Sequence, residues 1–169
     1  MTTVDLLRAM FQNAHETLEG TMKDVTPEQA HWLPPGKALP IRAQYAHTIG
    51  GEDACLNMFI RKAPPLFATA WEGRTGMSEL MPQTEPWDDW ARSLKVDLAQ
   101  LRQYAEAVYA QTDEYLAGLT PEDIEAEVDF AGMHPIGDAL GCFLISHVDQ
   151  HCGEISVVKG LQGAKGYPF

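Results

Sequence analysis

The sequence predicts an all-α protein, a four-helix bundle with long crossover connections. Four segments repeat apolar residues in steps of three and four, which is typical of amphipathic helices, and no long segment alternates apolar and polar residues with a period of two. Both major connections between these segments are longer than an antiparallel pair of helices needs. At 169 residues the chain is long enough for a substantial core, and we expect one domain over residues 1–169.

The first half of the chain predicts two of the bundle helices. The first begins near Thr2 or Thr3 and continues to about residue 25, where "TPEQ" supplies capping residues for a short helical turn that ends at Trp32. "PPGKALP" then breaks the chain, and the second bundle helix is expected over residues 41–62. Residues 63–86 have no sustained period, so we expect a long connection that could cover one mouth of the bundle.

The second half predicts the other two helices. The apolar residues over 87–119 keep steps of four and three, which predicts one continuous helix of some thirty residues. "TPED" repeats the earlier capping pattern, and "IEAEVDFAGMHPIG" predicts a turn followed by an irregular or briefly extended connector. The fourth helix is expected to begin near Pro135 or Ile136 and to end at Gly160 and Gly163.

Composition excludes several classes of protein. Twenty-four acidic and twelve basic side chains give a formal charge of −12, which repels nucleic acids and anionic lipid surfaces. No apolar run approaches the roughly 20 residues of a membrane-spanning helix, and the first residues lack the pattern of a signal peptide, so we expect a soluble, cytoplasmic protein. Cys55, Cys142 and Cys152 are odd in number and show no CxxC spacing, which argues against a disulfide framework or a thiolate zinc site.

Polar residues interrupt the apolar stripe of the fourth helix. His147 and His151 are four residues apart, about 40° in helical phase, so both imidazoles project from one face at the spacing at which they can share a metal ion. The spacing is that of HExxH metalloproteases, but Val148 stands where that motif has its glutamate base. We therefore reject the metalloprotease interpretation.

A third ligand is expected from His47, which lies on an apolar, small-residue face of the second helix. Three neutral imidazoles on facing helices predict a site with an open fourth position, which zinc, nickel or manganese would accept. The alternative is a buried polar network in which the histidines bond to Glu154, Tyr45 or Tyr104.

Two further residues are candidates for proton transfer. Glu154 follows His151 by one turn on the same face, so it could orient an imidazole, act as an acid or base, or add a ligand. His134 precedes Pro135 at the start of the fourth helix and could line the pocket.

Taken together, the opening amphipathic helix, "TPEQAHWLPPG", the isolated His47 and "HVDQHCGEI" resemble the DinB/YfiT-like superfamily of metal-binding four-helix bundles. The resemblance covers nearly the whole chain, and it implies that His47, His147 and His151 match the metal triad of the family. It also implies a bound nickel, zinc or manganese ion and a homodimer. Some members of the family are enzymes that use low-molecular-weight thiols, such as S-transferases and an isomerase.

Three functions follow as hypotheses. The first is a metal-dependent S-transferase or isomerase that delivers a thiol to a small electrophile, with Arg42 and Arg61 as cationic anchors for an anionic thiol. The second is a hydrolase that uses metal-bound water, with Glu154 or His134 as the proton carrier. The third is a stress-related metal-binding bundle without enzymatic activity.

Overall fold

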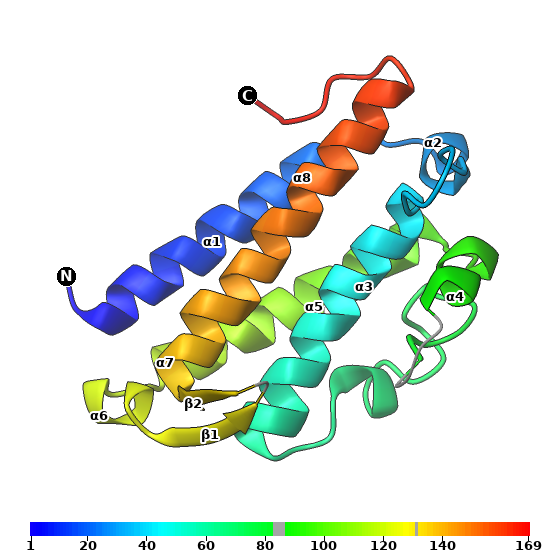
Figure 1. Ribbon diagram of the computed structural model, residues 1–169. Helices are drawn as coiled ribbons and strands as arrows, with labels where there is room; N and C mark the ends of the chain where they lie inside the picture. The colour runs from blue at the N-terminus through cyan, green and yellow to red at the C-terminus, as the bar shows by residue number, and fades with distance from the viewer. Residues whose placement is uncertain (83–86, 131) are drawn as a thin grey trace.

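The computed structural model describes residues 1–82, 87–130 and 132–169, and most of these residues are helical. Four long helical stretches lie side by side as a bundle (Figure 1). Their bounds are α1 (Thr3–Met22), α3 (Ile41–Ala54) continued by η1 (Cys55–Arg61), α5 (Leu98–Ala117), and α7 (Ile136–Asp138) continued by η3 (Ala139–Ile145) and α8 (Ser146–Leu161). The all-α prediction is confirmed.

Capping residues fix where the predicted helices begin. Thr2 and Asp5 form a reciprocal capping box at the start of α1, and Thr26 and Gln29 form another at the start of α2 (Pro27–His31). Thr120 repeats the arrangement at α6 (Pro121–Ile124). Each box satisfies backbone N–H groups that the first turn of a helix leaves without partners.

The second and fourth bundle helices each contain a π-helical segment that the periodicity did not predict. η1 extends α3 almost to the predicted end and stops at Lys62, whose φ of 54° is left-handed and ends the helix. η3 lies directly before α8 and therefore sets the rotation at which α8 starts. Such wide turns shift the faces of a helix relative to an uninterrupted α-helix, and they occur often at functional sites.

The predicted continuous helix over 87–119 is wrong. The structure has two helices, α4 (Trp87–Ser93) and α5, with a non-helical break between them. Asp97 causes the break, because its side chain accepts hydrogen bonds from the backbone N–H groups of Ala99 and Gln100 and so caps a new helix. Gly76 supports the break from outside, since its carbonyl accepts the N–H of Asp97 at 2.8 Å.

The connection after η1 is held against α3 by one buried carboxylate. Asp53 accepts the backbone N–H groups of Leu66 and Phe67 at 2.9 and 3.0 Å, and it also accepts the hydroxyl of Tyr104 at 2.7 Å. These bonds fix the short helix η2 (Leu66–Ala68) within the long connection that the sequence predicts. The last residues of the predicted connection, 83–86, lie outside the described residues.

A small hairpin covers one end of the bundle. β1 (Glu127–Phe130) pairs antiparallel with β2 (Met133–Pro135), as the prediction of a briefly extended connector implies, with residue 131 outside the described part. The ring of Phe130 lies 4.8 Å from that of Phe143 on η3, which in turn stacks on His147 at 5.7 Å. The hairpin therefore closes the end of the bundle and packs toward the histidine pair of α8 (Figure 1).

The core runs along the whole bundle and is apolar on the predicted stripes. It includes Leu7, Phe11 and Leu18 of α1 and Leu101 and Val108 of α5. Among the described residues, no helix has the length and apolar character that crossing a lipid bilayer requires.

Replacing Asp53 by alanine should lower the free energy of unfolding by about 3 kcal/mol, because the change leaves several buried donors without an acceptor. Urea unfolding followed by circular dichroism measures this loss. Asp113→Ala is the matched control: that aspartate pairs with Arg8 on the surface, with 61% of its side chain exposed, and should cost much less. Equal losses for the two variants would contradict the assigned role of Asp53.

Candidate metal centre

Three histidines meet where α3 and α8 lie against each other. His47 comes from α3, and His147 and His151 from successive turns of α8. The Nε2 atoms of His47 and His147 are 2.9 Å apart, and the three ring centroids are separated by 4.6 to 4.8 Å. One ligand atom from each ring lies within 4.8 Å of the other two, so the group could hold a metal ion.

Close contact between the two helices depends on a glycine. A Cβ placed on Gly51 would lie 3.2 Å from Cε1 of His147, which is tighter than ordinary van der Waals contact. The absence of a side chain at this position lets the imidazole of His147 rest on the backbone of α3, beside His47.

The nitrogens that face one another in the triad can act as metal ligands. Nδ1 of His147, which is buried and has no hydrogen-bond partner among the described residues, is the other nitrogen of that ring. Its Nε2 faces Nε2 of His47, and a neutral imidazole has one donor and one acceptor nitrogen. A tetrahedral zinc ion with bonds of about 2.0–2.1 Å needs nitrogens separated by about 3.3 Å, so small side-chain movements would bring all three onto one ion.

Burial keeps two of the three imidazoles neutral. Desolvation, with the neighbouring His147 and His151 adding to it, lowers the pKa of His47 from 6.5 to about 3. Desolvation likewise lowers the pKa of His147 to about 4, with a further decrease from His151 and an opposing effect of Glu52. At neutral pH these nitrogens therefore carry free lone pairs, the state in which histidine binds metals.

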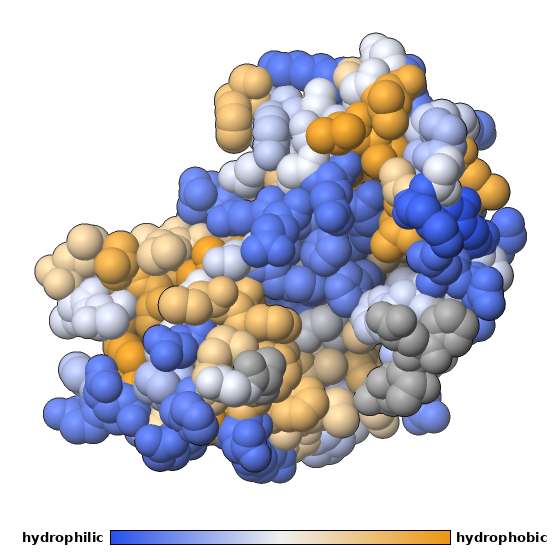
Figure 2. Space-filling view, viewed as in Figure 1, coloured by the Kyte–Doolittle hydropathy of each residue, from blue (hydrophilic) through white to orange (hydrophobic). Residues whose placement is uncertain are grey.

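Side chains around the triad orient its rings. The carboxylate of Glu154 lies 2.7 Å from Nδ1 of His151, which fixes the proton on that nitrogen and leaves Nε2 free to face the other rings. Nδ1 of His47 lies 2.9 Å from the sulfur of Met81, and Trp87 packs its ring edge-on against His47. The surface over the middle of α8 and the neighbouring part of α3 is hydrophilic (Figure 2).

The structure does not support the two predicted arginine anchors. Arg42 is 1% exposed, and its guanidinium donates to the backbone carbonyls of Leu94, Arg92 and His31, where it satisfies the ends of α4 and α2. The prediction that Arg42 binds a cosubstrate is therefore wrong. Arg61 donates to Asn57 at the end of η1, fourteen residues and about 20 Å along the helix from His47, so it too lies away from the triad.

The predicted proton carrier His134 also lies elsewhere. It stands on β2 with 71% of its side chain exposed, and its nearest charged partner is Glu127, at 3.7 Å. The structure thus places His134 on the surface of the hairpin and not beside the buried imidazoles. Of the two predicted carriers, only Glu154 contacts the triad.

A second polar group in the core was missed by the sequence analysis. Glu52 is fully buried, and its carboxylate accepts the hydroxyl of Thr112 at 2.6 Å and lies 2.9 Å from Nε2 of His15. His15 is itself nearly buried and stacks on Tyr109 with ring centroids 3.8 Å apart. The signal was a glutamate within an apolar helix, but its partners come from α1 and α5 and could not be identified from spacing.

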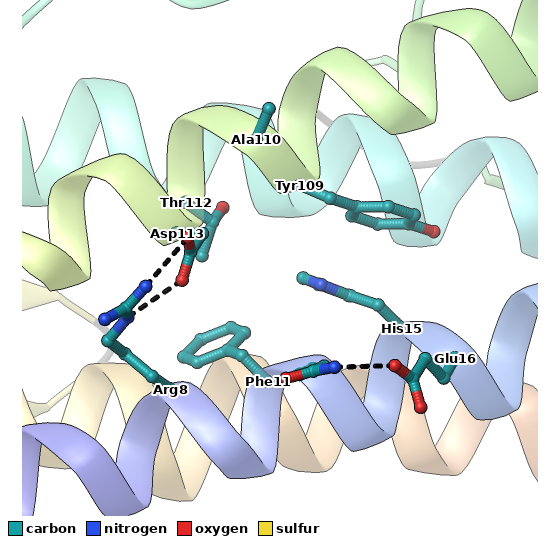
Figure 3. A pocket seen from close by; sticks show the side chains of 9 residues that line it. Arg8, Phe11, His15, Glu16, Tyr109, Ala110, Thr112 and Asp113 are labelled. Atoms are coloured by element: carbon teal, nitrogen blue, oxygen red, sulfur yellow. Dashed lines mark hydrogen bonds and ion pairs between the residues drawn. The ribbon is translucent and has the colours of Figure 1, made fainter.

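This group borders a cavity of about 380 Å³ in the groove between α1 and α5 (Figure 3). His15 and Tyr109 point toward one another across the groove, and a paired Arg8 and Asp113 close one end. The polar groups in this groove satisfy one another, whereas the triad between α3 and α8 brings one ligand atom from each of three imidazoles within 4.8 Å of the others. The triad is therefore the stronger candidate for a functional centre.

Comparisons with known proteins agree with this geometry. A sequence model of the DinB superfamily matches residues 10–155. The crystal structure of a conserved protein from Enterococcus faecalis matches with a TM-score of 0.80 and 21% identity, over 95% of this chain and 97% of that chain. At this identity the likeness shows the fold alone. No curated protein matches the chain.

The triad predicts about one equivalent of divalent metal per chain, measured by plasma mass spectrometry on protein purified without chelator. His147→Ala should lose most of it, since two imidazoles seldom hold an ion as well as three. His134→Ala is the matched control, because it removes an exposed imidazole, and should retain the wild-type content.

Glu154→Gln tests the orientation of His151 in the same experiment. Its zinc affinity should fall by about 10- to 100-fold, as removal of such a supporting carboxylate commonly does. Asp149→Asn makes the same charge change on another face of α8 and should have no comparable effect. Full metal content in His147→Ala would rule out the triad as the binding site.

The lowered pKa values predict how acid affects the metal-free protein. In the unfolded chain these imidazoles bind protons below about pH 6.5, whereas in the folded protein His47 and His147 stay neutral until about pH 3 and 4. Because the unfolded state binds more protons in between, their contribution is complete above pH 6.5 and is lost as the pH falls toward 4. The urea midpoint should fall over this range, and by less in His147→Gln. An equal fall in both proteins would show that His147 is not held neutral.

Proposed function

Because the chain belongs to the DinB superfamily and places three histidines around one point, we propose that it is a metal-dependent enzyme, either an S-transferase that joins a low-molecular-weight thiol to a small electrophile or an isomerase that uses such a thiol. The convergence of His47, His147 and His151 is the observation that carries the proposal. A divalent ion in such a site supplies a Lewis acid that favours the thiolate form of a thiol near neutral pH. Zinc and nickel suit imidazole ligands, and manganese is the third candidate.

The protein residues have separate tasks in this proposal. His47 and His147 present neutral nitrogens without first losing a proton, because their burial already disfavours the charged form. Glu154 orients His151 through the hydrogen bond to Nδ1 and, being largely exposed, can also exchange protons with solvent. Phe143 stacks on His147 and excludes water from that side of the ring.

A cavity beside Glu154 provides room for a polar cosubstrate. It has a volume of about 290 Å³ and includes Lys37 and Gln44 in its lining. Oε1 of Gln44 is buried and has no hydrogen-bond partner among the described residues, so it offers an acceptor to an N–H or O–H group of a ligand. Lys37 is the cation at this cavity, where its exposed ammonium pairs with Asp88 at 3.1 Å. We propose that Lys37, in place of the two arginines, exchanges this surface partner for an anionic thiol.

The hydrolase hypothesis has less support. It needs a proton carrier near the triad, and of the two predicted carriers His134 lies on the exposed hairpin, which leaves Glu154 alone for this task. A metal-binding protein without activity requires only the triad and leaves the cavity beside Glu154 without a role. The homodimer implied by the family stays a prediction.

The proposed activity should appear when zinc- or nickel-loaded protein is mixed with a panel of cellular thiols and a chromogenic electrophile. We expect thiol-dependent product at least tenfold above the rate without protein, and loss of that excess in His147→Ala. His134→Ala should keep the rate, which separates loss of the centre from the loss of any one histidine. Product formed at the same rate without thiol would favour the hydrolase. If the fully metal-loaded protein gives no product with any combination of thiol and electrophile, the proposal is contradicted.

A further inference from the structure

A second cavity beside the triad is almost entirely apolar. It has a volume of about 260 Å³ and lies between α3 and the connection that follows η1. Its lining consists of small or apolar residues, namely Gly50, Ala54, Phe67, Met77, Leu80 and Met81. Of the residues that the structure describes, no charged side chain lines it, so an ionised group would find no partner among these residues.

The cavity adjoins the metal centre on the side of His47. Gly50 lies one helical turn after His47 on α3, and so the two residues share a face. Met81, on the opposite wall, brings its sulfur to 2.9 Å from Nδ1 of His47. The ring of His47 and the side chain of Met81 therefore stand between this space and the nitrogens that face one another in the triad.

Gly50 marks the floor of the cavity. It is a buried glycine inside α3, where glycine costs helix stability relative to alanine, yet a Cβ built on it meets no atom within 4 Å. The next residue differs, because a Cβ on Gly51 would press against His147. Close packing against His147 therefore explains why residue 51 is glycine. Residue 50 has no such contact, and as glycine it keeps the space above the helix open.

The wall opposite α3 is fixed in place. Asp53 binds the N–H groups of Leu66 and Phe67, and Met77 forms an isolated β-bridge with Val96. The cavity is thus part of the folded structure and not a gap beneath an unattached loop. Its two methionines supply flexible, polarisable surface that adapts to the shape of an apolar ligand.

We propose that this cavity binds the apolar part of the electrophilic substrate, a group of about six to eight carbon atoms such as a single substituted aromatic ring. The size follows from comparison with apolar cavities, of which one of about 150 Å³ already binds benzene. The inference rests on the proposed function, in that the electrophile reacts at the adjacent metal centre. It adds the class of substrate: an electrophile with a compact, uncharged, apolar body.

The first test needs neither metal nor catalysis. Toluene should bind to the metal-free protein with a Kd below about 1 mM, measured by ligand-observed NMR. Gly50→Leu fills the cavity and should weaken binding at least tenfold. Gly160→Ala is the matched control, because Gly160 is an exposed helical glycine whose Cβ would also meet nothing within 4 Å. Absence of toluene binding, or equal binding to Gly50→Leu and wild type, would overturn the proposal.

The second test connects the cavity to the centre. In the cobalt-loaded protein, benzyl mercaptan and 2-mercaptoethanol each report binding to the metal through a thiolate-to-cobalt absorption band. Benzyl mercaptan should bind at least tenfold more tightly to wild type, and Gly50→Leu should remove this preference while it keeps its cobalt and still binds 2-mercaptoethanol. Equal affinity of the two thiols for wild type would overturn the link between cavity and centre. If neither thiol binds, the proposed thiol chemistry fails, and the toluene result alone decides whether the apolar cavity exists as a ligand site.

Discussion

The close approach of α3 and α8 is the constraint on which the rest of the molecule depends. It is possible because Gly51 leaves room for the ring of His147, and it brings that ring within 2.9 Å of His47. Imidazoles held so close and partly buried cannot easily be protonated, since like charges in a medium of low polarity repel strongly. The same contact that packs two helices therefore brings neutral nitrogens together, which is the condition for metal binding.

The polar residues of α3 have two different roles, and the two roles belong to different faces of the helix. Glu52 and Asp53 point into the bundle, where side chains of α1 and α5 and backbone groups of the following connection satisfy them. His47 faces α8, where its Nε2 lies 2.9 Å from Nε2 of His147. Buried carboxylates with complete hydrogen bonding specify how the helices pack, whereas the incompletely bonded histidines leave a capacity for a ligand.

The sequence predicted the bundle and the histidine pair of α8 from local rules, whereas His47 was expected from its place on a small-residue face of another helix and from the family resemblance. Capping boxes and steps of three and four located most helix starts, and spacing placed His147 and His151 on one face. The break before Asp97 and the burial of Arg42 were not predictable in this way, since both depend on hydrogen bonds between segments far apart in the chain. Periodicity indicates which face of a helix is apolar, but it does not indicate which backbone carbonyls need a hydrogen-bond donor. Arg42 supplies such a donor from inside the core.

The surroundings of the triad also differ from side to side in a way that constrains how a substrate can lie. On one side lies Glu154, whose cavity also contains Gln44 and Lys37 among apolar residues, and the surface over the middle of α8 is hydrophilic (Figure 2). The cavity above Gly50, on the side of His47, is apolar. Transfer of a charged group into an apolar space costs far more free energy than its contacts return, so a molecule with one polar and one apolar end can occupy the centre in only one direction. If a thiol and an electrophile react there, this asymmetry places the polar thiol beside Glu154 and the apolar body of the electrophile beside His47, with their reacting atoms between them. Orientation would then come from the two cavities, and the histidines would need to supply only the metal.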